Sequence, residues 1–150
     1  MQLADGNINL ALKLIENEED NNAQRFLDWM RACYNFRKNT NREVNPAVAL
    51  LTMADEFHAL DKLNQKNLLI YSINTMREIL LMLNGANSIN RIRGEELDSI
   101  QRLSKVLNSL EKVEKSFKLI NDATYHLERN GSAKMIFMDL SLQLAKTINP

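Results

Sequence analysis

The sequence predicts an all-α fold, a compact bundle of six or seven antiparallel helices, and three observations lead to this prediction. Proline occurs only at positions 46 and 150, and glycine only at positions 6, 85, 94 and 131, so few residues interrupt regular structure. Between these positions apolar residues recur every three or four positions, and no run alternates apolar with polar residues as a half-buried strand does. The connections between the helical patterns are short, which favours antiparallel neighbours.

Two helices are expected in the first 36 residues. The first covers about 7–17, and the polar run 18–22 is expected to end it. The second covers about 22–36, with Asp20 or Asn21 as its cap. The apolar side of the first helix consists of Leu10, Leu14 and Ile15, and that of the second of Phe26, Trp29, Met30 and Cys33.

The third helix opens at Asn45-Pro46, because Asn is favoured at the cap and Pro in the first turn. The fourth, over about 62–84, is expected to be the longest, with Gly85 as a glycine that ends it. Its apolar residues are spaced like a seam packed on a neighbouring helix: Leu69, Ile73, Met76, Leu80 and Leu83.

The fifth helix is expected to start near Gly94, and its inward side consists of Leu97, Ile100, Leu103 and Leu107. The sixth follows Asn108, which together with Glu111 has the spacing of a capping pair. Its inward side consists of Leu110, Val113, Phe117, Ile120, Thr124 and Leu127. On its other side the pairs Glu111–Lys115 and Glu114–Lys118 predict a solvated face.

The last helix, about 132–148, follows a break at Asn130-Gly131 and is apolar almost all round. Such a helix is either central to the core or covered by a partner. We assign Ile136, Leu140 and Leu144 to the core and Met135, Met138 and Leu142 to a partner contact, because Met adapts to irregular surfaces. The alternative, with both sides in the core, stays open. The expected core consists of Trp29, Phe57, Ile73, Leu80, Phe117, Leu127, Ile136, Leu140 and Leu144.

Composition excludes several classes of function. The 19 basic and 19 acidic residues give no net charge, which argues against a phosphate-binding surface for nucleic acid. No apolar run reaches the ~18 residues of a membrane helix, and the N-terminus lacks the pattern of a signal peptide. The single cysteine, Cys33, suits a reducing compartment, so a cytoplasmic location is expected.

The sequence contains no pattern that predicts catalysis or a cofactor. Neither a Gly-rich phosphate loop nor a nucleophile elbow is present. Asp55-Glu-Phe-His58 only approaches one half of a di-iron site, and His126 has Ala123 where the second half needs an acid. We therefore predict no metal site and structural roles for both histidines.

Four stretches carry a resemblance to a known family: Phe26–Tyr34, Asp55–Tyr71, Arg93–Leu97 and Tyr125–Leu142. In their order and spacing they resemble the C-terminal collar domain of bacterial DNA polymerase III clamp-loader subunits, in particular of the delta-prime type. Gly6–Leu12 is similar to the end of the family's lid module. Asn9 stands where ATP-hydrolysing relatives carry a nucleotide-sensing arginine, which fits the non-hydrolysing delta-prime type better than the gamma/tau type.

The resemblance implies an AAA+ lid-like end at 1–20 and a collar domain at 21–150. It also implies a non-catalytic oligomerisation role in DNA replication. The partners would be the delta and gamma/tau subunits, with the sliding clamp and DNA contacted only indirectly, and neither cofactor nor membrane would be involved. The alternative is a free-standing helical adaptor or regulator that acts through a protein–protein or homodimer interface. Composition and periodicity permit both readings.

Overall fold

The computed structural model describes the backbone of residues 2–38, 45–85 and 95–149, and their side chains except 2–9, 14–20, 37, 95–97 and 99. In this part of the chain all regular structure is helical, so the all-α prediction is confirmed. The helices are α1 (Gln2–Lys38), α2 (Pro46–Ala59), α3 (Lys62–Leu83), α4 (Glu95–Val106), α5 (Leu110–Glu128) and α6 (Ala133–Ile148).

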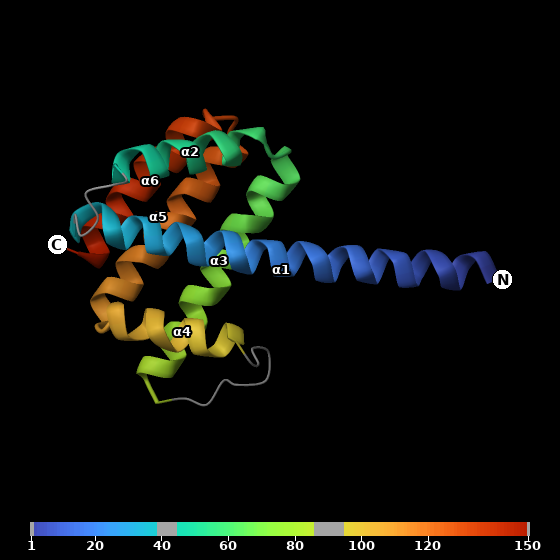
Figure 1. Cartoon of the computed structure of the whole chain (residues 1–150), viewed down its shortest axis with the longest axis horizontal. Coiled ribbons are helices and arrows are strands. Elements are labelled where there is room, and N and C mark those ends of the chain that lie inside the picture. The colour runs from blue at the N-terminus through green and yellow to red at the C-terminus, as the bar shows by residue number, and fades with distance from the viewer. Residues whose placement is uncertain (1, 39–44, 86–94, 150) are drawn as a thin grey trace.

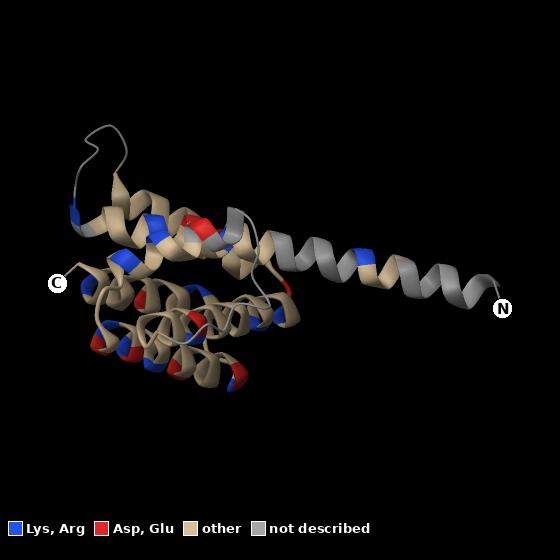
Figure 2. Cartoon of the chain, turned by 90° about the horizontal axis from the view of Figure 1, so that it is seen from below, with Lys and Arg blue, Asp and Glu red and all other residues tan. Residues whose placement is uncertain are grey.

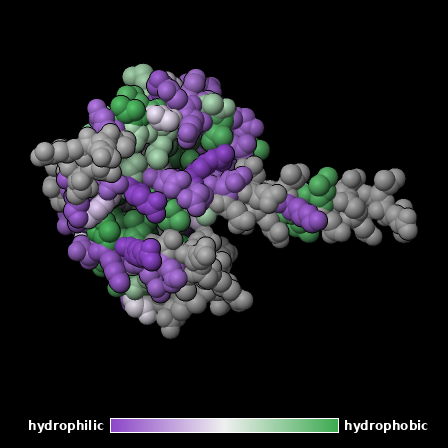
Figure 3. Space-filling model, viewed as in Figure 1, coloured by the Kyte–Doolittle hydropathy of each residue, from purple (hydrophilic) through white to green (hydrophobic). Residues whose placement is uncertain are grey.

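The helices form one bundle from which the first half of α1 projects (Figure 1). α5 packs between α3 and α6, while α4 packs against α3. α6 also contacts α1 and α2, and these two helices contact each other. Lys and Arg lie among Asp and Glu on the outside of the bundle, and hydrophobic patches interrupt its hydrophilic surface (Figures 2 and 3). None of the described helices has the length and apolarity needed to cross a bilayer.

Local capping residues fix most helix ends. The predicted Asn45 cap of α2 is confirmed, since its Oδ1 accepts a hydrogen bond from Ala47 N at 3.0 Å. Gly85 follows the end of α3 with φ +76°, a left-handed conformation that glycine adopts without strain. The predicted Asn108 cap is wrong, because Ser109 is the N-cap of α5 and accepts from Lys112 N at 3.2 Å.

The predicted break at 18–22 is wrong, because α1 is continuous over its 37 residues. Asp20 and Asn21 therefore lie inside a helix and not at its cap. The helix was predicted to end there because residues 18–22 are polar. Polar residues break a helix only weakly when neither glycine nor proline accompanies them. None occurs between Gly6 and Lys38, so nothing in the backbone interrupts the helix. The predicted division between residues 20 and 21 lies within this helix and stays a prediction.

The predicted core is confirmed at Trp29, Phe57, Leu127, Leu140 and Leu144, which are all buried. Four other predicted core residues are only partly buried and pack against its edge: Ile73, Leu80, Phe117 and Ile136. Leu97 falls among the side chains outside the described part, whereas the other residues predicted to face inward are buried, namely Ile100 and Leu103 in α4 and Leu107 directly after it.

The buried face of α3 includes Leu69 and Met76 of the predicted seam, whereas the other three seam residues are only partly buried, and it also contains small polar residues. Its members are Gln65, Leu68, Leu69, Ser72, Thr75, Met76 and Ile79. Ser72 and Thr75 donate to the carbonyls of Leu68 and Tyr71 at 2.8 and 2.9 Å, so burial leaves neither hydroxyl unpaired. The larger Ile73 and Leu80 are only partly buried and pack at the edge of the core.

Candidate functional site

The last helix is less apolar at its surface than the sequence suggested. Its inner side packs as predicted, with Leu140 and Leu144 buried. Its outer side is mixed, with exposed polar residues at Lys134, Asp139, Gln143 and Lys146. Among the predicted partner contacts, Met135 is 72% exposed, Leu142 is 41% exposed and Met138 is partly buried. The outer side of α6 is therefore mixed in polarity, and contact of these three residues with a partner stays a prediction.

The α2–α3 turn is joined to the α5–α6 turn by polar contacts. Lys66 Nζ lies 2.8 Å from Glu128 Oε1, and Lys62 Nζ donates to Asn130 Oδ1 at 2.5 Å. The hydrogen bond from Lys66, reinforced by its charge, lowers the pKa of Glu128. These contacts join two of the stretches that carry the family resemblance, Asp55–Tyr71 and Tyr125–Leu142. The Lys66–Glu128 pair is exposed and stabilises the fold little by itself.

Two further contacts strengthen this corner of the bundle. Gln65 Nε2 donates to the carbonyl oxygens of Phe57 and Leu60, both at 3.0 Å, and Phe57 O also accepts from Leu60 N at 3.1 Å, so the side chain closes the end of α2. Lys134 Nζ lies 2.7 Å from Asp55 Oδ1 and links α6 to α2. The corner is a structural joint, since its polar groups are engaged with one another.

The residues considered for chemistry do not form a reactive site. His58 and His126 are exposed, and the described residues hold no group of three or more His, Cys, Asp or Glu side chains placed to bind a metal. Cys33 is fully buried, its Sγ donates to Ser141 O at 3.6 Å, and burial raises the pKa of its thiol. The thiol is therefore not a nucleophile at neutral pH. The side chain of Asn9 lies outside the described part of the chain.

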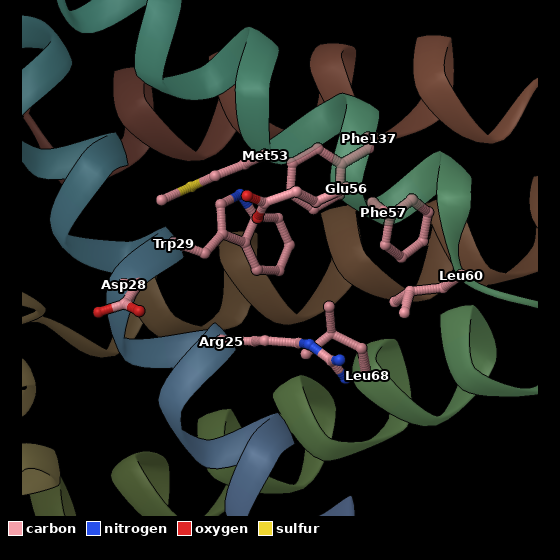
Figure 4. Close-up of a pocket in the computed structure, with 9 residues that line it drawn as sticks. All are labelled: Arg25, Asp28, Trp29, Met53, Glu56, Phe57, Leu60, Leu68 and Phe137. Atoms are coloured by element: carbon pink, nitrogen blue, oxygen red, sulfur yellow. The ribbon is translucent and has the colours of Figure 1, made fainter.

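A cavity of about 230 Å³, which the sequence reasoning missed, lies where α1, α2, α3 and α6 meet (Figure 4). Its lining combines three aromatic, three aliphatic and three charged residues: Trp29, Phe57 and Phe137; Met53, Leu60 and Leu68; Arg25, Asp28 and Glu56. The sequence held one signal for it. Arg25 precedes Trp29 by four positions, which places a cation on the inward side of the same helix.

The aromatic wall of the cavity is held in place by stacking and hydrogen bonds. Phe137 stacks on both Trp29 and Phe57, each with ring centroids 4.8 Å apart. Trp29 Nε1 donates to Ser141 Oγ at 2.8 Å, and this hydroxyl donates in turn to Phe137 O at 2.7 Å. The wall is therefore formed before anything binds to it.

The charged residues of the cavity differ in their partners. Asp28 Oδ1 accepts from Gln24 Nε2 at 2.9 Å and lies 3.9 Å from Arg31 Nη1. In Figure 4 Asp28 points away from the cavity, whereas Arg25 extends beneath the aromatic wall towards Leu68. Arg25 Nη1 is shielded from solvent and has no hydrogen-bond partner among the described residues. Arg25 thus lines the cavity with a guanidinium group of which one shielded nitrogen lacks an acceptor.

A wider groove of about 650 Å³ continues from the cavity between α1 and α2. The two share Asp28, Met53 and Glu56. The apolar part of the groove includes Ala32, Val48 and Ala49. Cavity and groove are continuous through these shared residues, and neither lining contains a serine, cysteine or histidine.

Comparison with known proteins gave no relative for this chain. No family model matches the sequence, and neither the curated proteins nor the solved structures contain a match. The functional proposal therefore rests on the four resembling stretches and on the surfaces described above.

Proposed function

We propose that this chain is a non-catalytic oligomerisation domain of a bacterial DNA polymerase III clamp-loader subunit, of the delta-prime type. It would pack into the cytoplasmic collar ring that supports loading of the sliding clamp during replication. Its neighbours in the ring would be delta and gamma/tau subunits, and the reaction of the complex would take place on other modules. The proposal is supported by the four resembling stretches and by an all-α fold in which two of them are joined at one corner.

The observation that carries the proposal is the outer side of α6. Met135 is 72% exposed and Leu142 is 41% exposed, with the partly buried Met138 between them in sequence. Large apolar side chains grouped on one helix face are typical of surfaces that bind another protein. Met is well suited to such contacts because its flexible thioether adapts to an irregular partner surface.

Co-purification with delta and gamma/tau subunits tests the proposal. The variants are Met135→Glu and Leu142→Glu, which bring a carboxylate into an apolar contact and are expected to weaken association about tenfold or more. The matched control is Ile70→Glu, a change of comparable chemistry at a residue that is 40% exposed on α3. The proposal is wrong if the folded wild-type chain binds none of the subunits, or if the control weakens binding as much as the two variants.

Light scattering on the isolated chain separates the proposal from the alternative of a free-standing adaptor. A stable homodimer that Met135→Glu or Leu142→Glu dissociates would show that the α6 surface binds a second copy. A monomer that associates only with loader subunits supports the collar role. Circular dichroism on each variant establishes that the fold is retained.

A further inference from the structure

We propose that the cavity beside Arg25 is a docking pocket for a segment of another protein that carries one bulky apolar side chain next to an acidic residue. The volume of about 230 Å³ sets the size of the anchor. It exceeds the ~150 Å³ of a cavity that binds benzene, and it is below the ~300 Å³ at which sites for drug-sized ligands begin. One side chain of the size of Phe or Leu fits this range.

The wall of the pocket favours binding because it is already ordered. The Trp29–Ser141 hydrogen bond and the stacked Phe137 ring fix the aromatic surface that an anchor side chain would contact. A preformed pocket avoids much of the ordering cost that binding otherwise incurs. Apolar anchors in such pockets supply most of the affinity of protein interfaces.

The charge of Arg25 defines the second feature of the partner. The guanidinium side chain of Arg25 lines the cavity, and a carboxylate is the acceptor that matches its planar donors. Its Nη1 atom is shielded from solvent, so a carboxylate in the cavity would meet the accessible part of the side chain and not Nη1. Asp28 does not supply this acceptor, since it points away from the cavity in Figure 4 and its Oδ1 lies beside Gln24 and Arg31. Glu56 lines the same cavity and repels an incoming anion, so its removal should favour the proposed partner.

The adjoining groove indicates a protein segment and not a small molecule. It is about 650 Å³ in volume and runs along α1 and α2 from the shared residues Met53 and Glu56. A small carboxylate would occupy the cavity and leave the groove empty, whereas a peptide could place its anchor in the cavity and its backbone in the groove. This surface is separate from the exposed side of α6, and the inference does not depend on the proposed collar role.

Trp29 is the single tryptophan of the chain and lines the cavity, so its fluorescence reports occupancy directly. The probes are two blocked peptides, acetyl-Glu-Phe-Glu-amide and acetyl-Gln-Phe-Gln-amide, titrated into the full chain. We expect saturable quenching or a shift of the emission, with the Glu peptide bound about tenfold or more tightly. Arg25→Gln should abolish this preference, and Glu56→Gln should increase affinity for the Glu peptide. Arg102→Gln, at an exposed position of α4, is the matched control and should change neither.

Three results would overturn the proposal. They are the absence of a saturable signal, equal affinity for the two peptides, and an unchanged preference in Arg25→Gln. Binding of 3-phenylpropionate without binding of the peptides would also overturn it, because the pocket would then take a small carboxylate. If Arg25→Gln does not fold, the Glu56→Gln variant still tests the proposal. The proposal is then contradicted if Glu56→Gln does not bind the Glu peptide more tightly than the wild-type chain does.

Discussion

Replacing Ser141 by alanine should destabilise the fold, because it leaves the buried indole N–H of Trp29 without an acceptor. Ser141 is fully buried and Trp29 is 2% exposed, so water cannot replace the lost hydroxyl. Phe137 O keeps its backbone bond within α6, and only the indole donor is left unpaired. An unpaired buried donor costs about 1–3 kcal/mol. In a domain of this size that corresponds to a fall in Tm of about 2–12 °C.

Ser72→Ala is the matched control for this substitution. Ser72 is also fully buried, and its Oγ donates to Leu68 O at 2.8 Å in the preceding helical turn. Its removal leaves no donor unpaired, because the carbonyl retains its helical partner. Alanine also has the higher helix propensity by up to about 0.5 kcal/mol. We therefore expect Ser72→Ala to change the free energy of unfolding by less than about 1 kcal/mol.

Urea unfolding followed by circular dichroism gives the free energy of unfolding of each variant, and Trp29 fluorescence is the second probe in the variants that retain Trp29. Coincident transitions by the two probes would establish the two-state behaviour that the comparison requires. The cycle is completed in a Trp29→Phe background, where the indole donor is absent and Ser141→Ala should cost no more than Ser72→Ala. The reasoning is refuted if Ser141→Ala and Ser72→Ala lower the free energy of unfolding of the wild-type chain equally. It is also refuted if Ser141→Ala lowers the free energy of unfolding in the Trp29→Phe background as much as it does in the wild-type chain.

Three further outcomes are expected. Gly131→Ala should destabilise the fold modestly, because its Cβ would lie 3.1 Å from the backbone oxygen of His126. The 2.8 Å approach to Ile136 Cδ1 can be relieved by movement of that side-chain end, so Ile136→Val should recover little of the loss in thermal melts. Leu144→Ala should cost about 2–5 kcal/mol in urea unfolding, whereas the exposed Leu142→Ala should cost under about 1 kcal/mol. Cys33 should react with a thiol reagent only as fast as the fold opens, since burial raises its pKa and shields it. Rapid labelling under native conditions would contradict that account.

Much of the fold could be predicted from the sequence because its breaks are local. Asn45-Pro46 starts α2 and Gly85 follows the end of α3, and both signals act on the backbone through the residue itself. The α5–α6 break was placed correctly as well, although Asn130, with φ 64°, and not Gly131 adopts the left-handed conformation there. Asn tolerates that conformation better than most residues with a side chain.

The sequence predicted helix faces less well than helix positions. For α3 the spacing of the large apolar residues predicted the side of the helix on which most of them lie. Ile73 and Leu80 belong to that predicted side. The buried face keeps Leu69 and Met76 of the predicted seam and also contains Ser72 and Thr75, whose hydroxyls are satisfied within the helix. Hydrophobicity alone cannot identify short polar residues as part of a buried helix face. Whether such residues are buried also depends on the helix that packs against them.

The cavity could not be predicted because its lining comes from four helices. Trp29 and Phe137 are 108 positions apart in the chain, and nothing local to either indicates that they stack. Arg25 was the only local signal, and a single cation on an inward helix face is also compatible with a solvated position. The unpaired state of its Nη1 atom is visible only once α2 and α3 are in place.

α6 connects the two proposed surfaces, and its geometry keeps their tests independent. Phe137 and Ser141 are four residues apart and face Trp29 on the inner side of the helix. Met135 is exposed, and it lies two residues before Phe137, a rotation of about 200° around an α-helix. A glutamate at the outer position should therefore leave Trp29 fluorescence and peptide binding unchanged while it weakens association with loader subunits. Arg25→Gln should do the reverse, so the failure of one proposal would leave the other standing.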